Sequence, residues 1–443
     1  MWGAHGTRRV DSGGARGQMR GRVAARLAIL ALLLLLSACG TTLTRSRIAP
    51  QTSLALSAAA APRLDPSLTV LARDYLARMT LDEKLGQLFV VELVGADYSP
   101  DNAAMVEQLH AGGILLYNRE MPNFRAAHDL VAAAQAHAST PLFVVVDEEG
   151  GWVDRMSDIY GFRPSAEMIA ATGSLDYARA QARQVARDMQ SIGLNFDLAP
   201  VVDVALVDGP DQSTRTFGAT PGAVTSFAGA WLNALQGSGV IGCLKHFPGL
   251  GAATTDAHLG LPLITRSREQ IEQVELAPYR ALIQQSDPGC IMSTDLLMPA
   301  IDPDLPAELS YKTITGVLRQ ELGYDGVVVT DALYMQGIAQ RYSQAVAGVM
   351  AIEAGCDFLM GPWDPSQTRD MIAALKAAIN SGQISMARID QSVLRLLKLK
   401  LRYGILSRTR ATIGTGITGA VAPPLGAPGA ALAEARKRQT AGD

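Results

Sequence analysis

Residues 326–331 read GVVVTD, a run of β-branched residues that begins after a glycine and ends at a carboxylate. A short apolar run of this kind is typical of a strand buried on both faces. Asp331 follows the run directly, so the strand would place a charged group at its carboxyl end. In folds built of parallel strands, reactive side chains gather at that end. The stretch therefore predicts a buried parallel strand that carries Asp331 to a functional site.

Seven more short apolar runs bounded by turn residues repeat this pattern, at 88–94, 113–117, 142–146, 194–198, 241–245, 290–294 and 357–360. Longer stretches with helical length and period separate them, at 123–138, 174–192, 220–238, 268–285, 311–322, 340–354 and 367–379. Eight strand-helix units in roughly 340 residues are the count and size of a TIM-type (β/α)8 barrel. The alternative, a doubly wound open sheet, is disfavoured because no glycine-rich dinucleotide motif begins a helix after the first strand. The predicted fold class is α/β, with one catalytic barrel domain over residues 67–407.

The composition argues against several classes of protein. The chain of 443 residues is 48% hydrophobic and 18% charged, with a formal net charge of −3. It has no basic or aromatic stripe of the kind that binds nucleic acid, so no nucleic-acid partner is expected. Cys39, Cys243, Cys290 and Cys356 lie far apart without metal-ligand spacing, so neither a disulfide framework nor a zinc site is predicted. The last three are expected to be buried thiols.

The N-terminus has the pattern of an export signal. Several arginines precede the apolar run 27–36, which is half the roughly 20 residues that a membrane-spanning helix needs. Leu36-Ser37-Ala38-Cys39 then resembles the lipobox of bacterial lipoproteins, in which cleavage occurs before a cysteine that receives lipid. We expect residues 1–38 to be a signal peptide and Cys39 to anchor an exported domain to a membrane, in the periplasm or at the cell surface. An uncut anchor or a plainly secreted protein is the alternative.

Two polar segments flank the predicted barrel. Residues 39–66 are rich in Thr, Ser, Ala and Pro without a sustained period, which suits a flexible tether between lipid and domain. Residues 408–443 are mostly Gly, Ala, Thr and Pro with a short charged end. We expect this C-terminal tail to be disordered.

Polar residues follow most of the other predicted strands. Asp147, Glu148 and Glu149 follow the third, Asp197 and later Asp203 the fourth, Lys245 and His246 the fifth, and Asp295 the sixth. A lone aspartate of this kind is more often a solvated loop residue. Joint placement at successive strand ends is instead what a barrel enzyme requires.

The fifth strand runs into the segment KHFPGLGAATTDAHLGLP, residues 245–262. Residues 249–255 are Gly, Leu, Ala and Thr without a helical pattern, which predicts a mobile loop. The loop carries Asp256 two positions before His258, and an imidazole oriented by a carboxylate is suited to proton transfer near neutral pH. The alternative is a surface loop with incidental polar residues.

Six motifs together resemble family 3 glycoside hydrolases: MTLDEKLGQL (79–88), DEEGGWV (147–153), the segment 245–258, VVTDALYMQGI (328–338), AGCDFLM (354–360) and IDQSVLRLLKLK (389–400). They occur in the family's order, and the resemblance covers about residues 67–407. It implies a β/α barrel that cleaves β-glycosides with retention, through a covalent glycosyl intermediate on an aspartate. The matching position is Asp331.

The resemblance also implies roles for other residues. Many family members take a glutamate acid/base from a second α/β domain, for which this chain leaves no room. The β-N-acetylglucosaminidase branch uses the histidine of an Asp-x-His loop, which corresponds to His258 with Asp256 as its partner. The same matching implies that the sugar is held by Asp147, Arg155, Arg215, Lys245 and His246. No metal or organic cofactor is implied.

Three positions depart from the family pattern, where Trp152 replaces an arginine, Glu148 a glutamine and Asp295 a histidine. These departures bear on substrate preference and the leaving-group side more than on the reaction class. Resemblance and export signal together predict a lipid-anchored β-N-acetylhexosaminidase that releases terminal β-linked N-acetylglucosamine from peptidoglycan-type or related glycans. The alternatives are a β-glucosidase or glycoside phosphorylase of the same family, or a non-catalytic glycan-binding lipoprotein.

Overall fold

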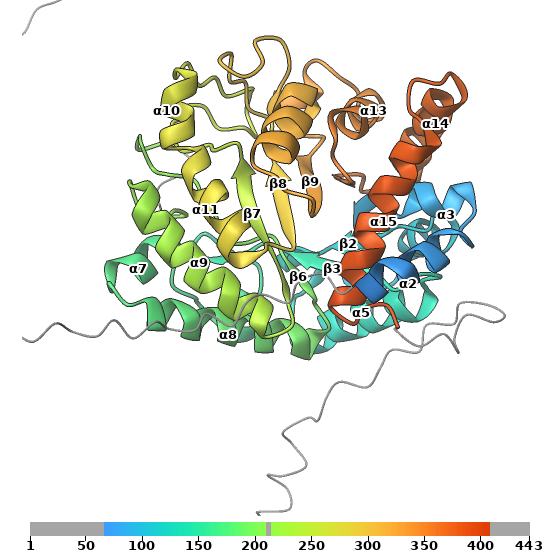
Figure 1. The fold of residues 1–443 in the computed structure, drawn as a ribbon. Coiled ribbons are helices and arrows are strands. Elements are labelled where there is room, and N and C mark those ends of the chain that lie inside the picture. The colour runs from blue at the N-terminus through green and yellow to red at the C-terminus, as the bar shows by residue number, and fades with distance from the viewer. Residues whose placement is uncertain (1–65, 210–213, 408–443) are drawn as a thin grey trace, which may run out of the picture. The chain divides into compact units, whose positions relative to one another are not determined.

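Eight parallel strands close into a barrel in the computed structural model, which describes residues 66–209 and 214–407 (Figure 1). The order around the barrel is β1-β10-β9-β8-β7-β6-β3-β2. The strands are β1 (Phe89–Glu92), β2 (Gly113–Leu115), β3 (Phe143–Val146), β6 (Phe196–Asp197), β7 (Ile241–Phe247), β8 (Cys290–Ser293), β9 (Val327–Ala332) and β10 (Phe358–Met360). Each overlaps one predicted apolar run, so the predicted barrel is confirmed. The predicted signal peptide, Cys39, nearly all of the tether and the C-terminal tail lie outside the described residues.

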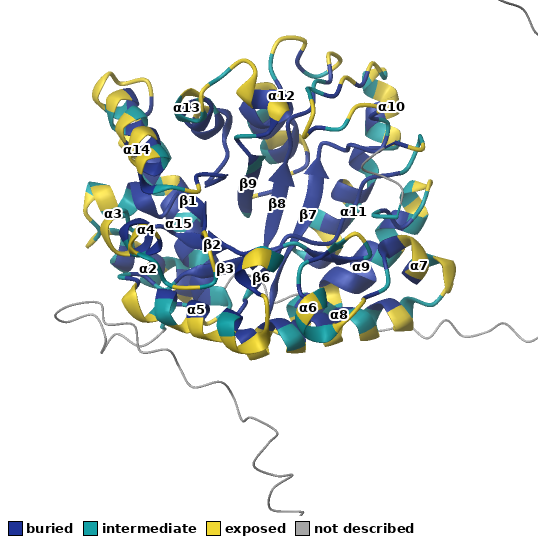
Figure 2. Cartoon of the chain, turned by 180° about the vertical axis from the view of Figure 1, so that it is seen from behind, coloured by how far each residue is buried: buried dark blue, intermediate teal, exposed yellow. Residues whose placement is uncertain are grey.

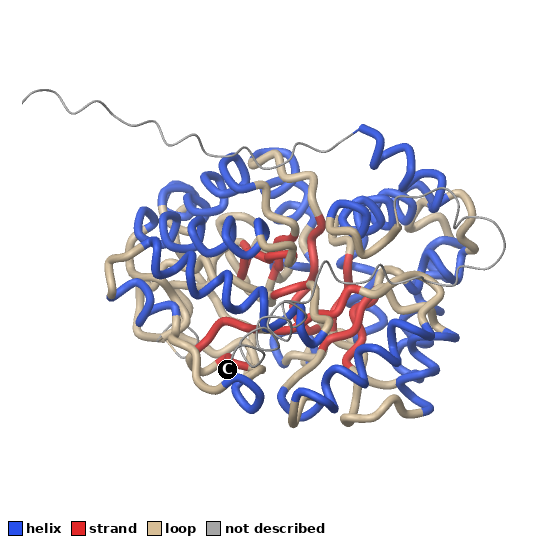
Figure 3. Tube along the Cα trace, turned by 90° about the horizontal axis from the view of Figure 1, so that it is seen from below, coloured by secondary structure: helices blue, strands red, loops and turns tan. Residues whose placement is uncertain are grey.

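Helices surround the strands, as the view along another axis shows (Figure 3). The α-helices are α2 (Pro66–Leu76), α3 (Leu81–Gly86), α4 (Pro100–Ala103), α5 (Phe124–His137), α6 (Ser157–Tyr160), α7 (Ala166–Ala171), α8 (Leu175–Ile192), α9 (Pro221–Gly237), α10 (Arg268–Gln273), α11 (Leu276–Ser286), α12 (Gln336–Ala339), α13 (Gln344–Ala354), α14 (Pro365–Asn380) and α15 (Met386–Arg402). The segments η1 (Ala104–Gln108) and η4 (Lys312–Glu321) are π-helical, and η2 (Asn118–Glu120) and η3 (Ala307–Leu309) are 3-10 helices.

Local sequence explains where the long helices begin and end. The Ser174 side chain accepts a hydrogen bond from the Tyr177 N–H at the start of α8, and Gly193 ends that helix in the left-handed conformation (φ 102°). Thr220 caps α9 and Asp364 caps α14, each with a proline in the first position of the helix. These residue types are the ones favoured at helix ends.

One predicted helix, at 268–285, is two helices in the structure. Val274 leaves the helical conformation (φ −120°, ψ −68°) between α10 and α11. The break turns Glu275 inward, where it is 1% exposed and its Oε1 lies 2.7 Å from Arg266 Nε. Helical periodicity is a local pattern and does not depend on this tertiary contact, so the sequence did not predict the break.

An antiparallel hairpin follows β3 and was not predicted. It pairs β4 (Glu148–Gly150) with β5 (Val153–Asp154), and its two strands are too short to leave a period in the sequence. The hairpin stands outside the barrel sheet and carries the DEEGGWV motif.

The interior of the barrel is packed with apolar side chains. Phe143 contacts Phe196 and Phe358 edge-on, with ring centroids 5.5 and 5.6 Å apart. The barrel strands are buried along their whole length except at Asp331, which is partly exposed. Figure 2 shows the strands in the buried class, with exposed residues on the outer faces of helices and on loops. Asp331 is therefore the barrel-strand residue with the greatest access to solvent.

Two further observations concern membranes and thiols. Cys243, Cys290 and Cys356 are free and buried, as expected. Within residues 66–209 and 214–407, no helix combines the length and the hydropathy that crossing a bilayer requires.

Candidate active site

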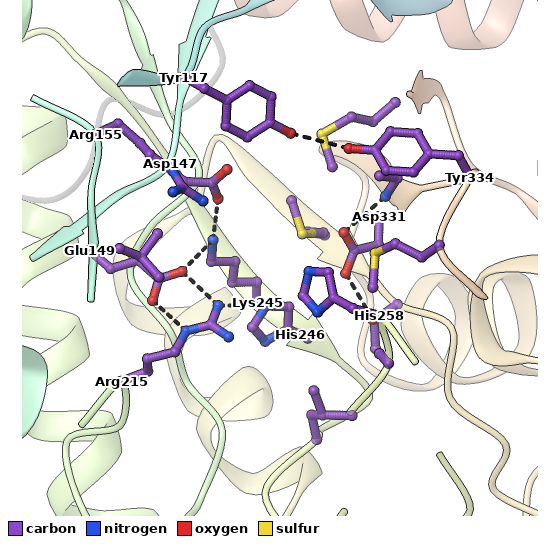
Figure 4. Close-up of a pocket in the computed structure, with 18 of the residues that line it drawn as sticks. Tyr117, Asp147, Glu149, Arg155, Arg215, Lys245, His246, His258, Asp331 and Tyr334 are labelled. Carbon is purple, nitrogen blue, oxygen red and sulfur yellow. Dashed lines mark hydrogen bonds and ion pairs between the residues drawn. The ribbon is translucent and has the colours of Figure 1, made fainter. Parts of the chain in front are cut away.

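A cavity of about 420 Å³ lies where the barrel strands end (Figure 4). Its walls include residues at or just after the ends of β1, β2, β3, β7, β8, β9 and β10. The predicted site residues that line it are Asp147, Arg155, Arg215, Lys245, His246, His258 and Asp331. Asp256 is not part of the lining but contacts His258, which is. The fold thus brings together side chains that are up to 184 positions apart, from Asp147 to Asp331.

Asp331 is held by three hydrogen bonds. Thr294 Oγ1 donates to Asp331 Oδ2 at 2.9 Å, and the Ala332 N–H donates to Oδ1 at 2.9 Å. The Asp331 N–H itself donates to Glu308 Oε2 at 2.9 Å. The carboxylate is therefore fixed in orientation while it remains partly exposed to the cavity.

His258 and Asp256 form a pair in the loop after β7. The backbone N and the ring Nδ1 of His258 both lie 2.8 Å from Asp256 Oδ1. Burial alone would raise the pKa of Asp256, but the hydrogen bonds from His258 outweigh it and lower that pKa. An anionic Asp256 that accepts the Nδ1 proton leaves Nε2 of His258 to exchange a proton with a ligand. The His258 side chain is 65% exposed.

Four charged residues form a chain along one wall. Lys245 Nζ lies 2.5 Å from Asp147 Oδ1 and 2.7 Å from Glu149 Oε1. Arg215 binds both oxygens of Glu149, each at 2.8 Å. Burial would lower the pKa of Lys245, but the Asp147 and Glu149 charges outweigh it and raise that pKa. Burial would raise the pKa of Glu149, but Arg215 and Lys245 hold it well below its usual range. Lys245 and Glu149 are thus both held in their charged forms at neutral pH.

Asp203 holds the His246 ring and backbone in place. The ring Nδ1 of His246 lies 2.7 Å from Asp203 Oδ2, and the His246 backbone N–H donates to Oδ1 at 3.3 Å. The same Oδ1 accepts the Leu250 N–H at 2.7 Å, which ties the start of the loop to the barrel. The other ring nitrogen, Nε2, lies 3.5 Å from Arg215. The carboxylate of Asp203, 3% exposed, therefore positions His246 without lining the cavity.

A second wall was not identified from the sequence. Tyr117 Oη donates to Glu92 Oε1 at 3.3 Å and lies 3.4 Å from Tyr334 Oη, while Arg119 lies 3.4 Å from Glu92 Oε2. Arg155 lies over the Tyr117 ring, 5.2 Å from its centroid. Burial raises the pKa of Glu92. Tyr117 ends the second apolar run, so the strand-end rule that selected the other residues could have found it. Glu92 lies inside the first run, and only the structure shows that strand β1 ends there.

The cavity lining lacks four of the predicted strand-end carboxylates, Glu148, Asp197, Asp203 and Asp295, which corrects their expected placement at the barrel mouth. Glu148 and Asp197 are both fully buried, and the Glu148 N–H donates to Asp197 Oδ1 at 3.0 Å. Glu148 Oε1 lies 2.9 Å from Arg163 Nε, so this residue ties the hairpin to the segment that follows it. The hairpin tip residue Trp152 is 81% exposed and is not part of the lining.

The residues that the structure describes contain no group of three or more His, Cys, Asp or Glu arranged to hold a metal ion. The cavity instead offers a partly exposed carboxylate, an imidazole oriented by a carboxylate, and a wall of paired charges. This set can attack an electrophilic carbon, exchange a proton and bind hydroxyl groups.

Comparisons with known proteins agree with this geometry. The sequence profile of the glycosyl hydrolase family 3 N terminal domain matches residues 80–399. Beta-hexosaminidase LpqI of Mycobacterium tuberculosis (strain ATCC 25618 / H37Rv) is 36% identical over 330 residues, which are 72% of this chain and 82% of that protein. Beta-hexosaminidase A of Pseudoalteromonas piscicida is 32% identical over 331 residues, 68% of this chain and 55% of that protein.

Solved structures give the same relationship. The glycoside hydrolase family 3 beta-N-acetylglucosaminidase from Paenibacillus sp. str. FPU-7 superposes with a TM-score of 0.72 at 33% identity, over 79% of this chain and 65% of that one. Fold, motif order and the extent of the profile match lead to one assignment: the chain belongs to glycosyl hydrolase family 3.

Proposed function

We propose that this protein is a retaining β-N-acetylhexosaminidase, in which Asp331 is the nucleophile and His258 the acid/base. The observation that carries the proposal is that Asp331 and the Asp256-oriented His258 line one cavity (Figure 4). Retaining hydrolysis needs one carboxylate to attack and a second group to give and then take a proton. The relatives named beta-hexosaminidases, at 32% and 36% identity, support the choice of substrate.

The reaction would proceed in two steps. Asp331 attacks the anomeric carbon as the bond to the leaving oxygen breaks, and His258 Nε2 gives its proton to that oxygen. The glycosyl ester on Asp331 is then cleaved by water, from which His258 takes a proton. Asp256 stabilises the imidazolium form of His258 throughout, as the carboxylate does in hydrolase triads.

The charged wall would hold the sugar. Lys245 and Arg215 are N–H donors whose hydrogen bonds to sugar hydroxyls can strengthen as charge develops in the transition state. Asp147 and Glu149 keep these cations in place at 2.5 to 2.8 Å. His246, positioned by Asp203, adds a further polar contact. These residues do not exchange protons with the leaving group in this scheme; they bind and orient.

The substrate would be a terminal β-linked N-acetylglucosamine on a peptidoglycan-type or related glycan. This part of the proposal rests on the branch resemblance of the Asp-x-His loop and on the export signal with Cys39. A lipid-anchored domain outside the cytoplasm would meet cell-wall material directly.

The test is turnover of nitrophenyl β-N-acetylglucosaminide and nitrophenyl β-glucoside, each with and without phosphate. We expect the first to be preferred and phosphate to have no effect on rate or product. A preference for the glucoside, or a sugar phosphate as product, would replace the proposal by one of the two alternatives within the family.

The nucleophile is tested by Asp331→Ala. Turnover should fall by more than about 10³-fold, because no second carboxylate can form the ester, while the melting temperature should change little. A fluoro-sugar trap should label a peptide that contains Asp331. A variant that keeps a tenth of the wild-type rate would rule out this assignment.

A further inference from the structure

The cavity lining differs between its two sides. The charged wall lies on one side, and Asp331 and Tyr334 lie on the other (Figure 4). The lining beside Asp331 includes four uncharged residues, Ala332, Tyr334, Met335 and Met360. The first three follow Asp331 in the chain, and Met360 pairs with Ala332 across the sheet. A sugar held by its hydroxyl groups would bind to the charged wall, so this largely apolar side is available to another part of the substrate.

Trp363 adjoins the apolar side of the cavity. It follows β10 by three residues, and Tyr334 follows the neighbouring strand β9 by two. The two rings meet at nearly a right angle, with centroids 4.9 Å apart and an interplanar angle of 79°. Such a T-shaped contact leaves at least one face of each ring uncovered by the other ring. Trp363 is 37% exposed, so part of its surface is open to solvent beside the cavity lining.

The backbone fixes Trp363 in this place. The carbonyl oxygen of Pro362 accepts the Glu92 N–H at 3.0 Å, which ties the residue before Trp363 to the end of β1. Gly361 packs so closely against Tyr334 that a Cβ atom placed on the glycine would lie 3.2 Å from Tyr334 Cδ1. An aromatic surface that is already ordered loses little conformational entropy when a ligand binds to it.

The position of His258 sets the side on which the leaving group departs. The Gly337 N–H donates to the carbonyl oxygen of Ala257, the residue before His258, at 3.4 Å. The segment after Tyr334 therefore contacts the loop that carries the proposed acid/base. The leaving oxygen must lie within hydrogen-bond reach of His258, while the sugar that forms the ester lies against the charged wall. The leaving group is thus directed away from that wall, toward Tyr334 and Trp363.

We propose that Trp363, supported by Tyr334, is the aromatic platform on which the first sugar of the leaving group stacks. The ligand is a pyranose ring with equatorial substituents, such as β-linked N-acetylglucosamine, whose two faces present C–H groups. A face of this kind packs on the negative face of an aromatic ring. The platform therefore selects a leaving group by its ring and not by its charge. This assignment rests on the proposed function and adds the leaving-group side to it.

The test compares two substrates that differ in whether the leaving group has a ring. Methyl β-N-acetylglucosaminide and the β1,4-linked disaccharide of N-acetylglucosamine both release alcohols that need protonation by His258, but only the disaccharide has a ring to stack. Trp363→Ala should lower the ratio of kcat/KM for the disaccharide to that for the methyl glycoside by about tenfold. Trp363→Phe should restore most of the ratio, because a phenyl ring still stacks. Partial unfolding of a variant lowers both rates alike, so an unchanged ratio in Trp363→Ala would overturn the proposal.

Trp152→Ala is the matched control. Trp152 is 81% exposed and, like Trp363, is not part of the cavity lining. It lies at the tip of the hairpin that carries Glu149 of the charged wall, so the ratio should keep its wild-type value. A loss in Trp152→Ala as large as that in Trp363→Ala would show that the effect is not specific to the platform, and the proposal would fail.

Tryptophan fluorescence separates a failure of this proposal from a failure of the proposed function. A wild-type protein that hydrolyses neither glycoside refutes the activity, whereas binding still decides the platform. Saturating disaccharide added to Asp331→Ala should shift the emission to shorter wavelength, because a sugar ring then covers the indole of Trp363. Adding Trp363→Phe to that variant should abolish the shift, and adding Trp152→Phe should keep it. The absence of a shift, or a shift that survives Trp363→Phe, would overturn the platform whatever the activity.

Discussion

Surroundings decide which carboxylate in the cavity can act as a nucleophile. Glu149 and Asp331 both line it, but Glu149 is bound by Lys245 and by two nitrogens of Arg215 at 2.7 to 2.8 Å. Within the described part of the chain, the Asp331 carboxylate accepts hydrogen bonds from neutral donors only, the Thr294 hydroxyl and the Ala332 N–H. A carboxylate paired with two cations is stabilised as an anion and is a poor nucleophile. Asp331 is the more reactive of the two.

An acid/base role of His258 can be distinguished from a sugar-binding role by how strongly the effect of its mutation depends on the leaving group of the substrate. His258→Ala should lose about 10²–10⁴-fold on glycosides with sugar-like leaving groups, which need protonation. The loss should be smaller for activated aryl leaving groups until cleavage of the ester becomes limiting. Asp256→Asn should follow the same trend more weakly, because the imidazole remains. Equal losses on all substrates through KM alone would instead identify His258 as a binding residue.

Gly337 lies too close to Asp295 to accept a larger side chain without a shift. Gly337→Ala would press a methyl group against Asp295 Oδ2, and we expect a loss of about 1–3 kcal/mol in unfolding free energy with a lower kcat. The matched control is Gly222→Ala in α9, where a Cβ meets nothing within 4 Å, so stability should be unchanged or slightly higher. Thermal melts and turnover of both variants decide this. Identical melting temperatures would show that the Asp295 contact is loose.

At the scale of elements, helix α15 places a lysine inside the protein. Lys400 is fully buried, with Nζ 2.7 Å from Gln87 Oε1 and 4.9 Å from the centroid of the Phe143 ring. Burial lowers its pKa from 10.5 to about 7. The helix is amphipathic in sequence, but its last turn brings a charged residue to the barrel core.

Because Lys400 is buried, the unfolding free energy of the protein should decrease as the pH is lowered from 10.5 to about 7. Between pH 10.5 and about 7 the unfolded chain binds a proton at Lys400 that the folded protein does not, so the unfolding free energy of the wild type falls as pH falls. Lys400→Met lacks this loss. As the pH is lowered from 10 to 7, the unfolding free energy of the variant should rise relative to that of the wild type by a few kcal/mol, on the order of the linkage energy. Below pH 7 the difference should stay constant.

Denaturant unfolding at pH 7 and pH 10 measures the effect. At pH 10 the variant should be the less stable one, because Gln87 Oε1 loses its donor. Lys398→Met, at a partly exposed position of the same helix, controls for the change of lysine to methionine. A constant difference between Lys400→Met and wild type at the two pH values would contradict the argument.

At the scale of the whole molecule, the proposed lipid anchor at Cys39 predicts that the protein is attached to a membrane. Cys39→Ser removes the thiol that would carry lipid, so the protein should leave the membrane fraction or keep its signal peptide. Cys290→Ser, which changes a buried barrel thiol, should still fractionate with membranes. Identical fractionation and gel mobility of Cys39→Ser and wild type would refute the anchor.

The sequence alone determined the barrel, because alternation of apolar runs and helical periods is a local property. It also placed Asp331, Lys245 and His246 at strand ends, since a parallel barrel gathers all such ends at one face. The Asp256-His258 pair was readable for the same reason: its two members are two positions apart, and the hydrogen bond between them is local.

Only the tertiary structure decided which side chains are paired, buried or protonated. Arg215 and Glu149 are 66 positions apart, and Tyr117 and Tyr334 are 217 apart, so their contacts exist only after the barrel has closed. Glu308 looks like an ordinary polar residue in sequence, and only its burial, with the charges of Asp295 and Asp331 nearby, raises the pKa of its carboxyl group. The charge state of a carboxyl group depends on the dielectric and the charges around it, and these are set by distant parts of the chain.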